Sequence, residues 1–89
     1  MTESPEHRLK RLRMRSWRRG TKEMDLILGP FADSALKELD SMDLDAFEAL
    51  LVENDQDLYS WFSGRAPTPE RHVKILDFVR SRHIGGLSR

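Results

Sequence analysis

The sequence predicts an all-α protein, a small five-helix bundle formed by a single domain over residues 1–89 with its ordered core at about 6–84. No segment shows the alternation of apolar and polar residues, enriched in β-branched side chains, that is typical of strands. Turn residues divide the chain into five stretches whose apolar side chains recur at helical spacing. Short loops between such helices favour a bundle in which neighbouring helices are mostly antiparallel.

The first helix is expected from about Glu6 to Arg18. Pro5 precedes it, and proline suits the first turn of a helix because it has no amide hydrogen to leave unpaired. Leu9 and Leu12, with Met14 as a further candidate, supply a narrow apolar stripe at helical spacing that Trp17 could close, and most of the remaining surface is arginine and lysine.

Gly20 should break the chain before a second helix from about Thr21 to Leu28. Pro30 lacks an amide hydrogen, and its ring would clash with the carbonyl oxygen of Leu26. We therefore expect Gly29-Pro30 to kink or restart the helix, with a displaced continuation to about Leu39.

Polar N-caps predict the third and fourth helices. Asp40 would cap the third helix, and Asp43 in its first turn would favour the positive end of the helix dipole. Asn54-Asp55 would cap the fourth helix, which Gly64 should end. The residues expected to face the core from these two helices are Leu44, Phe47, Leu50, Leu51, Leu58, Trp61 and Phe62.

Thr68-Pro69-Glu70 combines an N-cap residue, a proline and an acid, and so predicts the start of the fifth helix. Gly85-Gly86 should terminate this helix and leave residues 87–89 as a loose tail. The residues expected to form its broad apolar face are Val73, Ile75, Leu76, Phe78 and Val79.

The formal net charge of zero conceals three charged blocks. Residues 1–22 carry a net charge of +6, residues 23–59 carry −10 and residues 60–89 carry +4. Oppositely charged blocks could attract each other within one fold, or the basic block could steer the protein toward an acidic partner, either nucleic acid or protein. The net charge does not distinguish these alternatives.

Composition excludes several kinds of chemistry. The chain has no cysteine, which excludes disulfides, thiolate metal sites and a cysteine nucleophile. No apolar run is long enough for a transmembrane helix, and we expect no secretory leader. His7, His72 and His83 lie on different helices or helix ends, and none is accompanied in the sequence by both an acid and a nucleophile, so we expect them at the surface or at helix ends. The sequence therefore favours a protein that binds over one that catalyses.

The most distinctive segment runs from Trp17 to Asp25. If Arg19 and Glu23 share a helical turn, their four-residue spacing places opposite charges side by side. Gly20 would then let another backbone approach between them, making a patch that docks a protein. In the plainer interpretation, Glu23 caps the helix start and Arg19 is a solvated base.

Arg19-Gly20-Thr21-Lys22-Glu23 resembles the Arg-Gly-x-x-Glu signature of the FAD assembly factors of succinate dehydrogenase, the family also called succinate dehydrogenase assembly factor 2. Residues 18–25, followed by Leu28 and Pro30-Phe31, are similar to the junction and second helix of that family. Residues 54–62 resemble its acidic-then-aromatic fourth helix. The resemblance covers residues 8–83.

The resemblance implies an assembly chaperone, not an enzyme, that binds the flavoprotein subunit of succinate dehydrogenase, with fumarate reductase as a second candidate. It would promote covalent attachment of FAD to a histidine of that subunit while holding no cofactor stably and having no catalytic or metal-binding residues of its own. The factor would favour a domain arrangement that brings the flavin against the histidine.

The signature assigns partner-binding roles to particular positions. Arg19, Gly20 and Glu23 match it and are expected at the interface. The flanking residues Arg18, Lys22 and Asp25 are expected to contribute, and Trp17 and Tyr59 either anchor the partner or pack the bundle.

We expect the free protein to be a monomer, without nucleic-acid or membrane partners. We expect it in the bacterial cytoplasm, because only seventeen residues precede Arg18. The alternative function is a small regulatory protein-interaction module, or a nucleic-acid-binding module that uses its basic N-terminal arm.

Overall fold

Five α-helices make up residues 3–87, the part of the chain that the computed structural model describes; side chains are described over residues 3–83. Over these residues there is no strand, so the predicted all-α, five-helix fold is confirmed. The helices are α1 (Pro5–Trp17), α2 (Lys22–Ala35), α3 (Ser41–Leu51), α4 (Asp55–Ser63) and α5 (Glu70–Leu87), with a short 3-10 helix, η1 (Leu36–Glu38), after α2.

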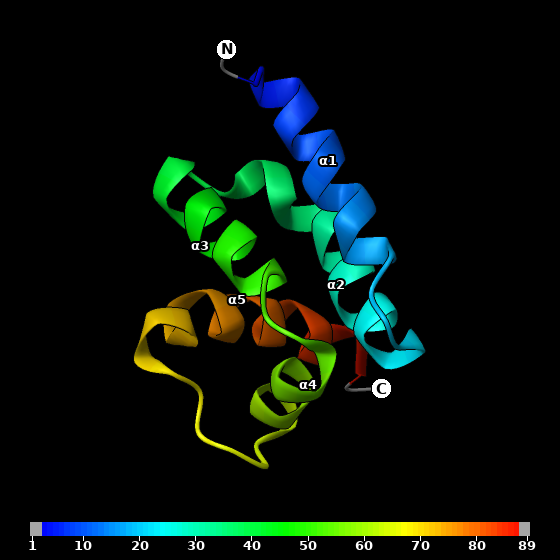
Figure 1. Cartoon of the computed structure of the whole chain (residues 1–89), viewed down its shortest axis with the longest axis vertical. Helices are drawn as coiled ribbons and strands as arrows, with labels where there is room; N and C mark the ends of the chain where they lie inside the picture. The colour runs from blue at the N-terminus through cyan, green and yellow to red at the C-terminus, as the bar shows by residue number, and fades with distance from the viewer. Residues whose placement is uncertain (1–2, 88–89) are drawn as a thin grey trace.

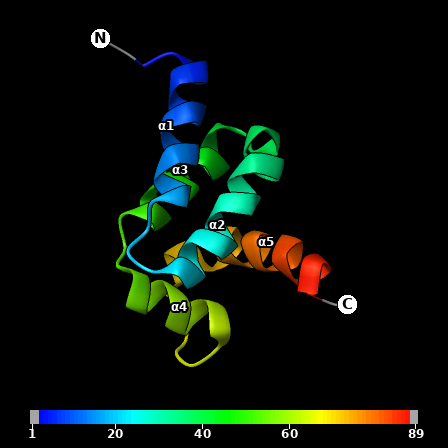
Figure 2. The same cartoon turned by 90° about the vertical axis from the view of Figure 1, so that its right-hand side faces the viewer.

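Helix α2 is the central element of the fold. It contacts α1, α4 and α5, while α3 packs against both α5 and α1. Figure 1 shows α1 running alongside α2, and the view turned by 90° in Figure 2 shows α5 crossing the N-terminal part of α2. The loop between α1 and α2 lies near the start of α4 in both views.

The core lies between these helices. Phe31 of α2 contacts Phe47 of α3 and Phe78 of α5, with ring centroids 5.3 and 5.5 Å apart. Burying each large apolar side chain contributes about 1.5–3 kcal/mol to folding. The fully buried apolar residues around this aromatic cluster include Leu12, Met24, Leu28, Leu50, Leu58 and Val79.

The helix ends follow the local signals closely. Ser4 caps α1, and Pro5 occupies its first turn. The side chains of Asp40 and Asn54 accept the amide hydrogen of the third residue beyond them, at 2.8 Å in each case. Gly64 ends α4 with a φ of +86°, a conformation that favours glycine. These results confirm the predicted starts of α3 and α4 and the predicted end of α4.

The helix does not restart at Pro30, because α2 continues as one α-helix through Pro30 to Ala35. Pro30 is exposed, and so is Leu26, whose carbonyl loses its intrahelical partner. Water can hydrate that carbonyl on the exposed side, so the helix tolerates the proline. Of the continuation expected to about Leu39, only η1 (Leu36–Glu38) lies beyond the end of α2.

Helix α5 runs through Gly85-Gly86 to Leu87, so the prediction that these glycines terminate it is wrong. Of the predicted tail, residues 88–89 lie outside the described part of the chain. The predicted apolar face is also shifted, because Val73 is 39% exposed and the neighbouring position, His72, is buried. The buried stripe is His72, Ile75, Leu76 and Val79, which recurs at the spacing of one helix face.

His72 corrects the expectation that the histidines lie at the surface or only cap helices. Its side chain is 1% exposed, and its Nε2 lies 2.8 Å from Glu53 Oε2. The hydrogen bond with His72, and then that with Arg71, lowers the pKa of the Glu53 carboxyl. Trp61 covers the imidazole, with ring centroids 5.5 Å apart.

Ion pairs join the basic first helix to the acidic third one. Arg8 contacts Asp45 at 2.6 Å and Glu48 at 2.9 Å, and Arg11 contacts Glu48 at 2.9 Å and Glu3 at 2.8 Å. The hydrogen bond from Arg11, and then that from Arg8, lowers the pKa of the Glu48 carboxyl. Part of the charge segregation in the sequence is therefore attraction within the fold.

Candidate functional site

The candidate site is the loop between α1 and α2, which contains the distinctive segment of the sequence. Helix α1 ends at Trp17, and Thr21 caps α2 by accepting the amide hydrogen of Met24 at 3.3 Å. The amide of Thr21 itself donates to Asp55 Oδ2 at 2.8 Å. The loop is thus fastened both to the helix that follows it and to the start of α4.

Arg19 holds this loop against the segment that joins α3 to α4. Its Nε lies 2.7 Å from Asp55 Oδ1, while its two terminal nitrogens donate to the carbonyl oxygens of Leu51 at 2.6 Å and Glu53 at 2.5 Å. The side chains of Arg19 and Asp55 are each only 10% exposed. The planar guanidinium has a fork of donors suited to this fixed geometry.

The expectation that Arg19 and Glu23 stand side by side is therefore wrong. Arg19 lies in the loop before α2, so the four-residue spacing does not place it on the same helical turn as Glu23. Arg19 pairs with Asp55 instead, and its backbone amide donates to Asp25 Oδ1 at 2.6 Å. Glu23 is exposed and has no hydrogen-bond or ion-pair partner among the described side chains.

Gly20 is exposed between these two residues. A Cβ atom built at Gly20 would lie 3.0 Å from Asp55 Oδ2, closer than most real Cβ contacts. Its backbone is not left-handed, so the requirement for glycine is one of space. The absence of a side chain lets the Asp55 carboxylate approach from within the molecule and leaves the outer side of the loop uncovered.

Glu23 borders a hollow between the start of α2 and the outer side of α4, which we call the acidic notch. Its volume is about 530 Å³. Tyr59, 38% exposed, lies at this notch and presents an amphipathic ring of the kind that is enriched at protein interfaces. The notch is lined by Thr21, Glu23, Asp55, Gln56, Asp57, Tyr59, Ser60 and Arg65.

The other predicted residues separate into exposed and packed groups. Arg18 and Lys22 are exposed, and Asp25 is half-buried beneath the loop. Trp17 packs the bundle: its indole lies over Gly29 of α2, where an added Cβ would be 2.4 Å from the ring, and its Nε1 lies 3.2 Å from both carboxylate oxygens of Asp33.

Sequence reasoning missed the role of Asp55. The acidic-then-aromatic segment from Asn54 to Phe62 marked this region, but the pairing with Arg19 spans 36 residues. No local spacing rule predicts such a contact, because each side chain could equally be solvated. Only the fold shows that the loop glycine, Gly20, lies against Asp55 at the start of α4.

The site offers groups for recognition. No cluster of three or more histidine, aspartate or glutamate side chains capable of holding a metal ion occurs over residues 3–83. None of the helices in the described part of the chain is long and apolar enough to cross a membrane. The buried polar groups hold the loop in place, while the exposed ones face outward. This arrangement defines a small helical binding protein.

Comparison with known proteins supplies the particular family. The family described as flavinator of succinate dehydrogenase matches residues 10–83. The chain is 41% identical over 70 residues to the mitochondrial succinate dehydrogenase assembly factor 2 of Mycosarcoma maydis, a match that spans 79% of this chain and 29% of the fungal protein.

Bacterial relatives match over most of their length. FAD assembly factor SdhE of Legionella pneumophila strain Lens is 36% identical over 64 residues, which is 72% of this chain and 81% of that protein. FAD assembly factor SdhE of Pseudomonas savastanoi pv. phaseolicola is 35% identical over 70 residues, covering 73% and 83% of the two chains. The chain therefore belongs to the succinate dehydrogenase flavinator family.

Proposed function

We propose that this protein is an assembly factor that binds the flavoprotein subunit of succinate dehydrogenase and promotes covalent attachment of FAD to that subunit. The observation that carries the proposal is the family match over residues 10–83, which includes the loop anchored by Arg19. The relatives described above are named for FAD assembly and for succinate dehydrogenase assembly.

In this proposal the residues of the signature have two roles: some position the loop, and others contact the partner. Arg19 and Asp55 hold the loop from inside, so Gly20 and Glu23 are presented in one fixed conformation. A preorganised surface loses less conformational entropy on binding than a mobile one. The interface therefore consists of the exposed residues Gly20, Lys22 and Glu23 with Arg18 beside them, while Arg19 and Asp25 position the loop.

The new covalent bond forms within the partner, and FAD is a substrate of that reaction. This chain acts by binding one arrangement of the partner more tightly than the others, which shifts its population. A preference of about 1.4 kcal/mol for the competent arrangement raises its population ratio tenfold. The chain needs no stably bound cofactor for this role.

The flavoprotein subunit of fumarate reductase is a second partner within this proposal, since it presents a related substrate for flavin attachment. We further propose that the free factor is a monomer and that it works in the bacterial cytoplasm. The high coverage of the two bacterial relatives supports this location.

The decisive test measures covalent flavin on the succinate dehydrogenase flavoprotein by in-gel fluorescence. A strain without this protein should lose most of the signal, and the wild-type gene should restore it. Glu23→Ala should fail to restore it, whereas Glu70→Ala, an exposed acid on α5, should restore it fully. Unchanged fluorescence in the strain that lacks the protein would refute the proposed function.

A further inference from the structure

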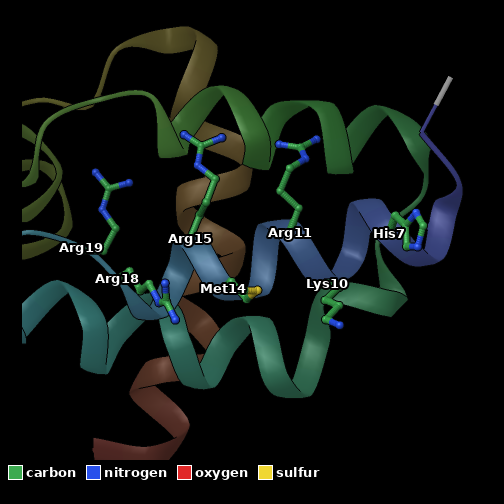
Figure 3. A pocket seen from close by; sticks show the side chains of 7 residues that line it. All are labelled: His7, Lys10, Arg11, Met14, Arg15, Arg18 and Arg19. Carbon is green, nitrogen blue, oxygen red and sulfur yellow. The ribbon is translucent and has the colours of Figure 1, made fainter. Parts of the chain in front are cut away.

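A second hollow lies along the outer side of α1, away from the acidic notch. This basic groove has a volume of about 430 Å³ and is lined by His7, Lys10, Arg11, Met14, Arg15, Arg18 and Arg19. Figure 3 shows Met14 between two sets of cationic side chains: Arg11, Arg15 and Arg19 point toward α3, while Lys10 and Arg18 lie on the opposite side.

The two sets differ in the contacts that they already make within the fold. Arg11 pairs with Glu3 and Glu48, and Arg19 pairs with Asp55. Arg15 donates to the carbonyl oxygen of Leu51 at 3.4 Å. The cations that point toward α3 are thus engaged with groups of their own fold.

Lys10 and Arg18 are exposed and form no ion pair with any described side chain. Lys10 lies on α1 one turn before Met14, and Arg18 follows the last residue of the helix, four residues after Met14. Met14 is 43% exposed, a large apolar side chain open to solvent between two free cations. Methionine adapts well to an irregular apolar contact, because its side chain is unbranched and polarisable.

The spacing of these three residues determines the ligand that fits. Lys10 and Trp17, the last residue of α1, lie about 10 Å apart along the axis, at about 1.5 Å per residue, and Arg18 follows directly, so the two cations are roughly 12 Å apart. In an extended peptide, alternate side chains share one face, and four residues span about 13 Å. A segment with the pattern acid-x-apolar-x-acid therefore places its carboxylates at Lys10 and Arg18 and its apolar side chain on Met14.

We propose that the basic groove binds an extended acidic segment of the partner, one that carries an apolar residue between two carboxylates. The proposal rests on the proposed function, since the segment belongs to the flavoprotein subunit, and it adds the chemistry of a second contact surface. This surface continues from the loop at Gly20 along α1, because Arg18 and Arg19 line the groove at that end.

A nucleic-acid backbone fits the groove less well. Arg8 and Arg11, two of the bases in the first half of α1, are neutralised by Asp45, Glu48 and Glu3. Two free cations support few phosphate contacts, and affinity for duplex DNA depends on their number.

Methionine oxidation provides the direct test. Met14 and Met42 are both exposed, at 43% and 78%, and Met24 is fully buried. The wild-type protein is treated with hydrogen peroxide, alone and bound to the purified flavoprotein subunit, and sulfoxide at each methionine is measured by mass spectrometry. Binding should slow oxidation of Met14 at least about fivefold while Met42 on α3 reacts at its free rate. Equal oxidation of Met14 in the free and bound protein would overturn the proposal.

Charge reversal provides a second, independent test of the proposal. Lys10→Glu combined with Arg18→Glu should weaken binding to the flavoprotein subunit about tenfold or more, chiefly by slowing association, because charges at the rim of an interface steer encounter. The control Lys37→Glu, at an exposed lysine of η1, should bind like the wild type. Wild-type affinity for the double variant would refute the groove assignment.

The outcomes also separate this inference from the proposed function. If the wild-type protein does not bind the flavoprotein subunit at all, both the proposed function and the groove assignment are refuted. If it binds, but Met14 is not protected or charge reversal leaves the affinity unchanged, only the groove assignment is refuted. A fluorescent duplex DNA that binds at the same salt concentration, and is released by the double reversal, would assign the groove to nucleic acid instead.

Discussion

At the scale of single residues, the signature divides into one inward-facing arginine and several outward-facing groups. Arg19 donates to Asp55 and to two backbone carbonyls, and its side chain is 10% exposed. Removing one partner of a largely buried ion pair costs more than the pair contributes, because the remaining charge is left uncompensated. The same five-residue motif therefore serves both folding and recognition.

Arg19→Ala should destabilise the protein by about 3 kcal/mol, since the Asp55 carboxylate would lose its counter-ion. Arg18→Ala is the matched control: this neighbouring arginine is exposed, and its change should stay within about 0.5 kcal/mol of the wild type. Glu23→Ala should be equally mild. Urea denaturation followed by circular dichroism measures all three. An Arg19→Ala protein as stable as the wild type would show that the inward contacts contribute nothing.

At the scale of helices, the packing of α1 on α2 depends on a single missing side chain. Gly29 lies inside α2, where glycine normally weakens a helix by about 1 kcal/mol relative to alanine. Here the indole of Trp17 occupies the space that a Cβ would need. Helix propensity and helix packing therefore make opposite demands at this position.

Gly29→Ala should destabilise the protein by about 1–3 kcal/mol, because the added methyl group would overlap the Trp17 ring. The smaller side chain of Trp17→Leu should relieve this overlap. In that background the same Gly29→Ala change should be neutral or stabilising. Thermal melts of the four proteins form a double-mutant cycle, and additive effects of the two substitutions would show that the indole does not impose the glycine.

At the scale of the whole molecule, ion pairs between the basic N-terminal block and the acidic middle block connect α1 to α3. The basic block and the acidic block meet where Arg8 and Arg11 contact Glu48. These side chains are 24–38% exposed, so each contact contributes modestly and is screened by salt. Lys10 on α1 and Arg18 directly after it form no ion pair with a described side chain, and these are the charges assigned above to the partner.

The lowered pKa of Glu48 predicts how stability depends on pH. A carboxyl whose pKa is lower in the folded state contributes stability above its ordinary pKa, and this contribution is lost as pH falls through the lowered folded value. The wild type should therefore exceed Glu48→Gln by about 1 kcal/mol or less at pH 7, and the difference should vanish at about pH 2.

Urea denaturation at both pH values measures the effect of Glu48→Gln. Glu70→Gln serves as the control, because Glu70 is exposed and forms no ion pair with a described side chain. Its difference from the wild type should change less with pH. A Glu48 contribution that grows on acidification would contradict the pairing.

Much of the fold could be predicted because its signals are local. Asp40, Asn54 and Gly64 act on amides and carbonyls within a few residues of themselves, so their patterns mark helix ends directly. The fold class and the position of the signature loop followed from such signals. The expected restart at Pro30 did not occur because the free-energy cost of a proline within a helix depends on whether water reaches the freed carbonyl. The surroundings of the helix decide whether it does.

The sequence by itself determined five helices, most of their boundaries and a resemblance carried by a loop glycine between charged residues. Tertiary structure alone decided that Arg19 turns inward to Asp55, that His72 is buried against Glu53, and that Lys10 and Arg18 stay free. The reason is physical. Helix formation rests on hydrogen bonds over four residues, whereas a charge finds its partner only after packing has brought distant segments together.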